Sequence, residues 1–225
     1  FWCHLMTKEL QKRIITSFFL LIVLTLVYRY TYILISALII LSVLSWFEFS
    51  ILIHRIFKIN KLKNIILKFF ISLIGLAYIT FFSFTMLSSF LNFEDKVLFS
   101  YALSLCIASD LGGILFGKLF KGKKLGKISP NKTRSGVVGS YFLSFLFMII
   151  YYLSLNDFKI IFLIILTFAV STTSQLGDLL ISYIKRKAKV KNTSNLLPGH
   201  GGILDRIDGI IFGAPLGFIL GSFYI

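Results

Sequence analysis

Four aspartates stand where an apolar sequence makes a charged side chain costly. The stretch 196–213, LLPGHGGILDRIDGIIFG, carries Asp205 and Asp208 directly before an apolar run that continues to the C-terminus, and Asp110 and Asp178 interrupt earlier apolar runs. A charged aspartate at the centre of a bilayer costs about 2.5–3.5 kcal/mol on insertion scales, so such acids usually face the interior of a helix bundle and mark a functional site. We therefore expect the four carboxylates to share one site.

The spacing of these acids indicates metal binding. Asp205 and Asp208 are three residues apart and share one face of a helix, while Asp178 and Ser182, four apart, form a second such pair. Converging carboxylates beneath basic loops can hold a hard cation such as Mg²⁺, which prefers a few carboxylates together with waters and phosphate oxygens of a substrate. An ion pair between each acid and a nearby Lys or Arg is the alternative that needs no ligand.

Residues 118–136 could bind phosphate. This segment combines glycines, several lysines and the sequence SPNKT ahead of the next apolar run. Glycine-rich backbone can approach a phosphate closely, and the N-terminus of a following helix offers free N–H groups to an anion. Lys132 and Arg134 could neutralise the charge of a nucleotide triphosphate. The P-loop pattern G-x-x-x-x-G-K-[ST] is absent, however, and a basic loop on the inner side of the membrane would have a similar sequence. His200, in PGHGG, has no His or Cys partner at zinc spacing, which favours a structural role.

The elements that must position these residues are membrane-spanning helices. Hydrophobic residues make up 57% of the 225 and the mean hydropathy is +0.88, whereas soluble domains are roughly 45–50% apolar. A bilayer core about 30 Å thick needs about 20 apolar residues in a helix. We therefore predict an all-α, polytopic transmembrane bundle of about seven spans (six to eight). The predicted spans are 14–28, 30–53, 69–93, 97–117, 135–155, 160–184 and 207–225.

Basic residues orient the predicted bundle. All but three of the 24 Lys and Arg residues fall before the first predicted span or after the second, fourth and sixth, the exceptions being Arg29, Lys96 and Lys159. By the positive-inside rule the N-terminus and the loops 118–134 and 185–206 are cytoplasmic. The net charge of +15 then follows from topology and attraction to anionic lipid, and the sequence contains no nucleic-acid-binding module.

The chain divides into three parts. Residues 1–5 precede Met6 and read as a leftover or misassigned start. Residues 6–96 are predicted to form N-terminal membrane spans, and residues 97–225 a catalytic membrane domain. The role of Glu48, inside the second predicted span, is left open.

The run 182–208, SYIKRKAKVKNTSNLLPGHGGILDRID, resembles the signature of the phosphatidate cytidylyltransferases, or CDP-diacylglycerol synthases, which includes P-G-H-G-G-x-x-D-R-x-D. One position departs from the family, because Asn192 stands after Lys191 where the family has Asp. The N-terminal half is also a span or two shorter than usual. Other segments that resemble the family are SDLGG (109–113), SQLGD (174–178), ISPNKT (128–133) and the WFEF around Glu48.

The resemblance implies a reaction in which CTP and phosphatidate give CDP-diacylglycerol and pyrophosphate. It implies a requirement for Mg²⁺ and a site at the cytoplasmic face of the inner (cytoplasmic) membrane. The lipid phosphate would attack the α-phosphorus of CTP, a chemistry that depends mainly on positioning and charge stabilisation. The expected partners are CTP, phosphatidate and membrane lipid, without nucleic acid; a homodimer and a second metal or monovalent cation are left open.

The resemblance also suggests roles for individual residues. Asp178 and Asp205 are expected to ligate the metal. Asp208 is expected either to ligate it as well or to contact the residues that do. The expected catalytic residues are Asp178, Asp205, Asp208, Lys185, Arg206 and His200. The expected substrate-binding residues are Ser129, Lys132, Thr133, Arg134, Ser182, Arg186, Lys191, Gly201 and Gly202.

Two other functions are left open. A CTP-dependent lipid kinase of the dolichol or phytol type would transfer the γ-phosphate of CTP to an alcohol. An ion-coupled transporter could use Asp110 and Asp178 as a relay. The H-G-G-x-x-D-R-x-D run favours cytidylyl transfer over the kinase, and no inverted repeat relates the two halves of the sequence.

Overall fold

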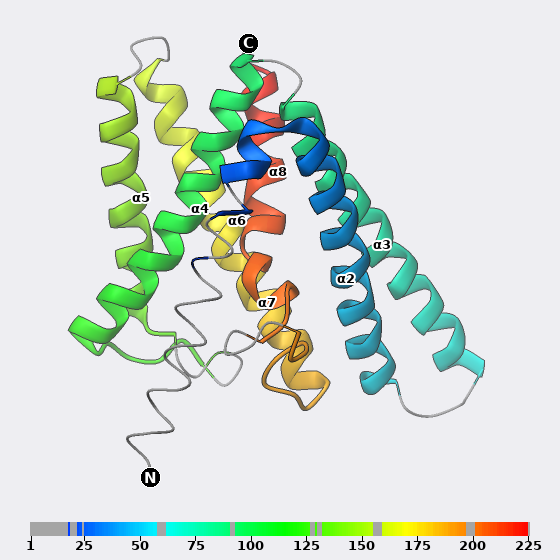
Figure 1. The fold of residues 1–225 in the computed structure, drawn as a ribbon. Helices are drawn as coiled ribbons and strands as arrows, with labels where there is room; N and C mark the ends of the chain where they lie inside the picture. The colour runs from blue at the N-terminus through cyan, green and yellow to red at the C-terminus, as the bar shows by residue number, and fades with distance from the viewer. Residues whose placement is uncertain are drawn as a thin grey trace. The chain divides into compact units, whose positions relative to one another are not determined.

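In the parts of the chain that it describes, the computed structural model consists of helices joined by turns and loops, and an isolated antiparallel bridge pairs Lys124 with Thr133. The described residues are 18, 22–23, 25–57, 62–90, 93–126, 129, 132–154, 159–196 and 201–224. The helices are α2 (Thr31–Ile56), α3 (Leu62–Ser89), α4 (Phe93–Phe120), α5 (Arg134–Ser154), α6 (Ile160–Lys187), α7 (Leu204–Ile207) and α8 (Ile210–Ser222) (Figure 1).

Five of these helices, α2 to α6, are long and apolar enough to cross a membrane. The prediction of an all-helical membrane protein is therefore confirmed. About half of the first predicted span, 14–28, lies outside the described residues. The last, 207–225, differs from the prediction, because a turn at Asp208 and Gly209 breaks it and leaves the 13-residue α8, shorter than the roughly 20 residues that a straight crossing needs.

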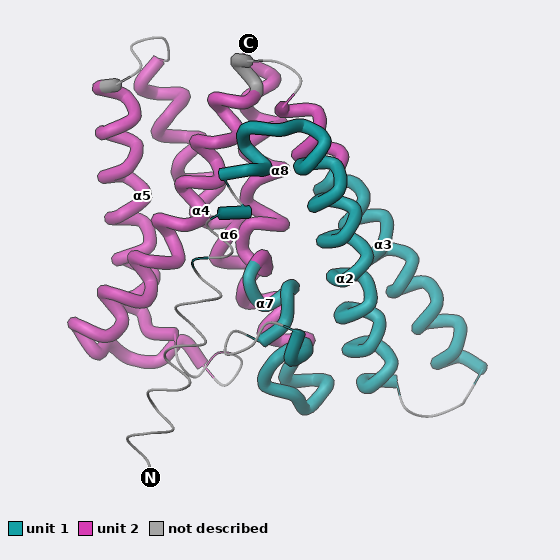
Figure 2. The backbone as a smooth tube through the Cα atoms, in the orientation of Figure 1, with its two compact units in different colours: residues 1–83, 185–206 teal, residues 84–184, 207–225 magenta. Residues whose placement is uncertain are grey.

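The chain forms two compact units (Figure 2). Unit 1 contains residues 1–83 and 185–206, and unit 2 contains residues 84–184 and 207–225. The boundaries fall inside α3, α6 and α7, so the two units share these helices, and the predicted site residues are divided between the units. Each unit is described by itself.

In unit 2, α8 presents glycine at every fourth position to its neighbours. A Cβ atom at Gly209 or Gly213 would meet the Ser174 side chain of α6, and one at Gly217 or Gly221 would meet side chains of α4. Small residues at this spacing let membrane helices approach closely. Around them lies a buried core from α4, α5 and α6: Leu98, Tyr101, Ala102, Leu105, Cys106, Met148, Leu163, Leu166 and Val170.

Glycines also set the crossing of α4 with α5, which lie side by side in Figure 1. A Cβ at Gly136 would come within 2.8 Å of the Gly113 carbonyl oxygen, and one at Gly139 within 2.7 Å of the Gly112 carbonyl oxygen. The glycines that the sequence places around the basic loop therefore serve backbone contact between two helices.

Replacing Gly139 with Val is expected to lower stability by about 1–3 kcal/mol, the usual cost of overpacking, because the new side chain would overlap Phe116 and the Gly112 backbone. The melting temperature in detergent measures this. Val138→Ala, at an exposed neighbouring position, is the control and should change it little. An unchanged melting temperature for Gly139→Val would contradict the close crossing.

Buried hydroxyl groups connect α4, α5 and α6. The Ser140 hydroxyl of α5 donates to the Ser109 carbonyl of α4 at 2.7 Å. The Ser171 hydroxyl of α6 lies 3.2 Å from that of Ser109, and Tyr101 and Thr167 meet at 2.6 Å. Hydrogen bonds between membrane helices contribute about 0.6 kcal/mol each on average. These contacts fix the turn of α4 that carries Asp110.

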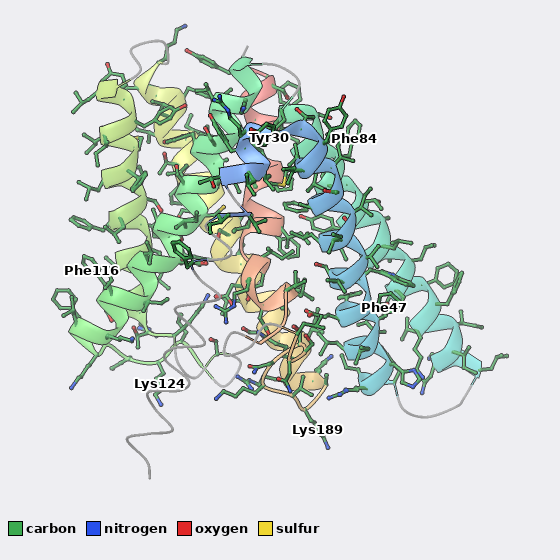
Figure 3. All side chains as sticks on the ribbon, in the orientation of Figure 1. Tyr30, Phe47, Phe84, Phe116, Lys124 and Lys189 are labelled. Atoms are coloured by element: carbon green, nitrogen blue, oxygen red, sulfur yellow. The ribbon has the colours of Figure 1, made fainter. Side chains whose placement is uncertain are left out.

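Unit 1 contains α2, most of α3 and the segment after α6. The hydroxyls of Ser42 and Ser83 meet at 2.6 Å, and Gly75 of α3 lies against the ring of Phe49 of α2. Exposed apolar side chains such as Phe47 stand out from these helices (Figure 3), as contact with lipid tails requires.

Candidate functional site

Polar side chains, several of them predicted site residues, form two groups, one in each unit. In unit 2, the hairpin cluster consists of Asp110, Lys132, Asp178 and Ser182. In unit 1, the loop anchor consists of Glu48, Lys185, Thr193, Ser194 and Asp205. The two groups are built from different elements and are described in turn.

The connection between α4 and α5 folds into a short hairpin. α4 ends where Lys121 adopts the left-handed backbone conformation, with φ of 41°. The Leu125 amide then donates to the Lys132 carbonyl and the Arg134 amide to the Lys123 carbonyl, both at 2.9 Å. These bonds fix the backbone on both sides of Lys132, so its side chain starts from a defined position.

Thr133, expected to contact substrate, is the N-cap of α5. The Gly136 amide donates to its hydroxyl oxygen at 3.1 Å, the usual geometry of a helix N-cap, which typically contributes about 1 kcal/mol. Of the other residues expected to bind substrate here, Ser129 accepts the Lys132 amide through its carbonyl at 3.1 Å, and Arg134 is the exposed first residue of α5.

Lys132 forms an ion pair with Asp178, the centre of the hairpin cluster. The side chains are 29% and 21% exposed, so solvent and solutes can reach both. The Ser182 hydroxyl, one turn along α6, donates to Asp178 Oδ1 at 3.3 Å. Asp110 is exposed and interacts electrostatically with both Asp178 and Lys132. Two carboxylates thus lie close to one ammonium group, which leaves negative charge to attract a further cation.

Asp208 is buried at the turn between α7 and α8. Its Oδ1 accepts the Gly209 amide at 3.0 Å. On α6, a Cβ at Gly177 would come within 2.8 Å of the Asp208 carbonyl oxygen. The absence of a side chain at Gly177 therefore lets the turn that carries Asp208 lie directly against the turn of α6 that carries Asp178.

In unit 1, the C-terminus of α6 reverses the chain. The Val190 amide donates to the Lys185 carbonyl and the Lys189 amide to the Arg186 carbonyl, both at 3.0 Å. Lys189 adopts the left-handed conformation, with φ of 56°. This pattern is a Schellman motif, and it starts the loop that leads to Thr193.

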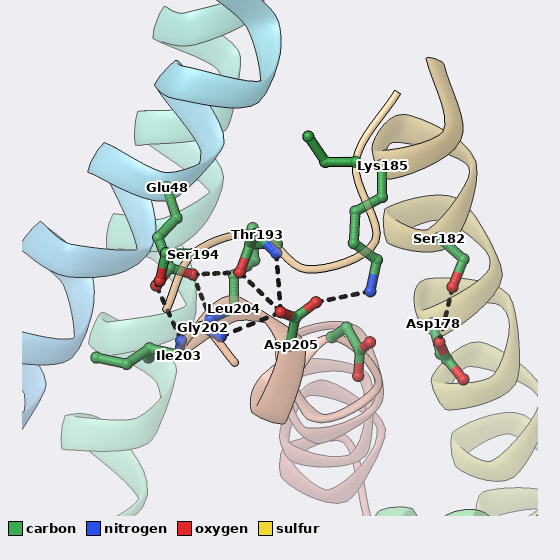
Figure 4. A network of polar contacts seen from close by, with 12 residues as sticks. Glu48, Asp178, Ser182, Lys185, Thr193, Ser194, Gly202, Ile203, Leu204 and Asp205 are labelled. Carbon is green, nitrogen blue, oxygen red and sulfur yellow. Dashed lines mark hydrogen bonds and ion pairs between the residues drawn. The ribbon is translucent and has the colours of Figure 1, made fainter. Parts of the chain in front are cut away.

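Asp205 closes that loop (Figure 4). Its Oδ1 accepts the Lys185 ammonium at 2.7 Å, while Oδ2 accepts the amides of Thr193 at 2.8 Å and Gly202 at 3.1 Å. Burial alone would raise the pKa of Asp205. The hydrogen bond from Lys185, the Thr193 amide, the Lys185 charge and the Gly202 amide together outweigh burial and hold the pKa below its ordinary value.

Because the folded-state pKa of Asp205 is lowered, its contribution to stability is complete above the ordinary aspartate pKa of about 3.9 and is lost as pH falls through the folded-state value. In buffer without Mg²⁺, the melting temperature of the protein should exceed that of Asp205→Asn by a constant margin from about pH 7 to about pH 4. The margin should shrink below that. A margin that stays constant into stronger acid would contradict the lowered pKa.

Glu48 of α2 holds both ends of the same loop. Only 1% of it is exposed. Oε1 accepts the Ser194 hydroxyl at 2.6 Å and the Ile203 amide at 3.0 Å. Oε2 accepts the Thr193 hydroxyl at 2.7 Å and the Leu204 amide at 2.9 Å (Figure 4). The sequence left the role of Glu48 open. A single acid inside an apolar span was the feature that could have predicted a functional role for it, since such acids are costly in a membrane.

The other predicted residues of unit 1 have varied surroundings. Gly201 adopts a φ of 88°, which favours glycine, and a Cβ there would lie 3.0 Å from Asp205 Oδ2 and 3.4 Å from the Asn192 side chain. His200 lies outside the described residues. Arg186, Lys191 and Arg206 are exposed. Within the described ranges, no three His, Cys, Asp or Glu side chains gather into a metal site.

Comparison with known proteins identifies one family and several relatives. The family described as "Cytidylyltransferase family" matches residues 2–224. Three relatives are named phosphatidate cytidylyltransferase. That of Rickettsia bellii (strain RML369-C) is 38% identical over 128 residues, covering 52% of this chain and 54% of the relative. That of Rickettsia felis (strain ATCC VR-1525 / URRWXCal2) is 38% identical over 148 residues, covering 60% and 63%. That of Staphylococcus aureus (strain COL) is 41% identical over 119 residues, covering 52% and 45%. The matches thus span about half the length of these relatives.

Proposed function

The chain belongs to the cytidylyltransferase family, and on that premise we propose that it transfers the cytidylyl group of CTP to phosphatidate, giving CDP-diacylglycerol and pyrophosphate. The observation that carries the proposal is the partly exposed Lys132–Asp178 pair, with Asp110 nearby, in which both acids belong to helices long and apolar enough to cross a membrane. The relatives that this chain matches over about half of their length are named for this activity.

In the proposed reaction, a phosphatidate oxygen forms a bond to the α-phosphorus of CTP. The bond from that phosphorus to the β-phosphate oxygen breaks, and pyrophosphate leaves. Such transfers depend on holding the two phosphates in line and stabilising their charge. Lys132 supplies an ammonium group for the triphosphate, and the backbone hydrogen bonds of the hairpin fix the main chain from which its side chain extends.

The donor set of unit 2 fits Mg²⁺. Asp178 is partly exposed, Ser182 adds a hydroxyl, and Asp208 lies on the turn packed against Gly177. Mg²⁺ is usually held by one or two carboxylates and keeps waters and substrate phosphate oxygens. We propose Asp178 and Asp208 as its protein ligands. When bound, the metal would neutralise charge that develops on the phosphates.

Asp205 remains a proposed Mg²⁺ ligand, but only its Oδ1 could bind the metal without losing a backbone hydrogen bond. Its Oδ2 accepts two amides, whereas Oδ1 accepts the Lys185 ammonium. A metal at Asp205 would therefore share Oδ1 and displace or rearrange Lys185. We propose that Lys185 and the exposed Arg186, Lys191 and Arg206 of unit 1 bind phosphate. We propose the same role, separately, for Arg134 of unit 2.

We also propose a membrane orientation. The basic segments that follow α2, α4 and α6 would lie in the cytoplasm, with the N-terminus on the same side and about seven spans in the whole bundle. The hairpin cluster would then meet CTP from the cytoplasm and phosphatidate from the membrane.

Product analysis tests this function. The purified protein is incubated in mixed micelles with phosphatidate, Mg²⁺ and CTP, and the expected products are CDP-diacylglycerol and pyrophosphate in equal amounts. In a parallel incubation with a lipid alcohol in place of phosphatidate, a phosphorylated lipid with CDP would instead indicate a CTP-dependent lipid kinase. Ion flux into proteoliposomes without CTP, and no nucleotide product, would favour a transporter and contradict the proposal.

A further inference from the structure

We propose that Glu48 is a positioning residue for cytidylyl transfer, which fixes both ends of the segment 195–202 from α2. The inference rests on the proposed function. Its structural basis is that Glu48 binds the residues before this segment, Thr193 and Ser194, and those after it, Ile203 and Leu204.

The contacts of Glu48 are divided evenly between its two oxygens. Each oxygen accepts one hydroxyl and one backbone amide, at distances from 2.6 to 3.0 Å. An ionised carboxylate has no donor and can accept at both oxygens. Because the side chain is buried, these four donors also satisfy a charge that would otherwise be very costly.

A glutamine cannot reproduce this arrangement. Its shape is the same, but one oxygen becomes an NH₂ group that carries two donors. In either orientation that group would face a backbone amide, of Ile203 or of Leu204, donor against donor. Glu48→Gln therefore separates the chemistry of the carboxylate from the space that it fills.

Glu48 and Asp205 act on the same loop from its two sides. The Thr193 hydroxyl lies 2.7 Å from Glu48 Oε2 and 3.1 Å from Asp205 Oδ2, and its single proton serves the shorter contact. Gly202 donates its amide to Asp205, while the next two amides go to Glu48. Releasing Glu48 would thus let Asp205 and its partner Lys185 move, and both are proposed to act on the phosphates or metal.

The test combines hydrogen exchange with kinetics on full-length protein in detergent. The variants are Glu48→Gln, Ser194→Ala and the double variant. Ser45→Ala is the control, since it removes a buried hydroxyl of α2 that has no hydrogen-bond partner within the described residues. Glu48→Gln should raise exchange of the Ile203 and Leu204 amides at least about tenfold and lower kcat/KM about 10- to 100-fold, as losing one hydrogen bond to a charged group would.

The double variant distinguishes positioning from general stability. Ser194→Ala alone should lower kcat/KM several-fold. In the Glu48→Gln background it should have almost no further effect, because both substitutions disrupt the same hydrogen bond between Ser194 and Glu48. A merely structural role would show this coupling in the melting temperature and leave kcat/KM unchanged at temperatures where every variant is folded. If Glu48→Gln does not fold, Ser194→Ala carries both measurements alone.

Three results would overturn the inference. If the Ile203 and Leu204 amides of Glu48→Gln exchanged at the wild-type rate, Glu48 would not hold this loop. Faster exchange with unchanged kcat/KM would leave an anchor that does not position the reaction. A wild-type protein that shows no cytidylyl transfer would refute the proposed function and the positioning role with it, while the exchange measurement would still report whether Glu48 holds the loop.

Discussion

Asp178→Asn is expected to lower the rate of cytidylyl transfer on the order of a thousandfold, at the upper end of what losing one preorganised charge-stabilising group costs. The change keeps the shape of the side chain and removes its charge. It deprives Lys132 of its ion-pair partner and the proposed Mg²⁺ of a ligand. Steady-state kinetics at saturating CTP measures the loss, and added Mg²⁺ should not restore it.

The same change should hardly affect folding. Both side chains of the Lys132–Asp178 pair are partly exposed, and exposed ion pairs contribute about 0–1 kcal/mol. The melting temperature should therefore stay close to that of the unchanged protein. Ser182→Ala, which keeps the carboxylate and removes a hydroxyl at 3.3 Å, is the graded control, with a loss of about tenfold or less. Near-normal turnover in Asp178→Asn would remove Asp178 from the site.

Lys132→Met is expected to lower kcat/KM for CTP about 10- to 100-fold, because hydrogen bonds to charged groups contribute about 1.5–3 kcal/mol. Methionine has a similar length and no charge, so the triphosphate would lose one ammonium contact. Part of the loss should appear as a higher KM for CTP. Lys132→Arg should retain some activity, since it keeps the charge with a different geometry.

Lys124→Met is the matched control for Lys132. Lys124 lies opposite Thr133 on the other arm of the same hairpin and is exposed, and its labelled side chain projects from the hairpin in Figure 3. Neutralising it changes the net charge of the loop by the same amount. An equal loss of activity in both variants would mean that the loop acts through its overall charge and would contradict a specific role for Lys132.

Local spacing predicted much of the fold and part of the site. Runs of apolar residues predicted α2 to α6 to within a few residues at most ends, since span length follows from bilayer thickness. The four-residue spacing of Asp178 and Ser182 predicted a contact that the structure contains. The alternative in which acids pair with nearby basic side chains also holds, for Asp178 with Lys132 and for Asp205 with Lys185.

Contacts between distant residues could not be predicted in this way. The partners of Glu48 follow it by 145 to 156 positions, and no periodicity in α2 points to them. The glycines within residues 118–136 suggested phosphate binding. One of them, Gly136, packs against the Gly113 backbone of α4, because a missing side chain serves either purpose. The turn before α8 was missed since the apolar run continues through Gly209.

Following the transferred phosphorus tests the central claim most directly. The purified protein, phosphatidate and Mg²⁺ are incubated with CTP that carries radiolabel at the α-phosphate in one sample and at the γ-phosphate in another. Cytidylyl transfer predicts label in the lipid from the α position and in pyrophosphate from the γ position. Label in the lipid from the γ position, or from neither position beside an active control enzyme, would contradict the account.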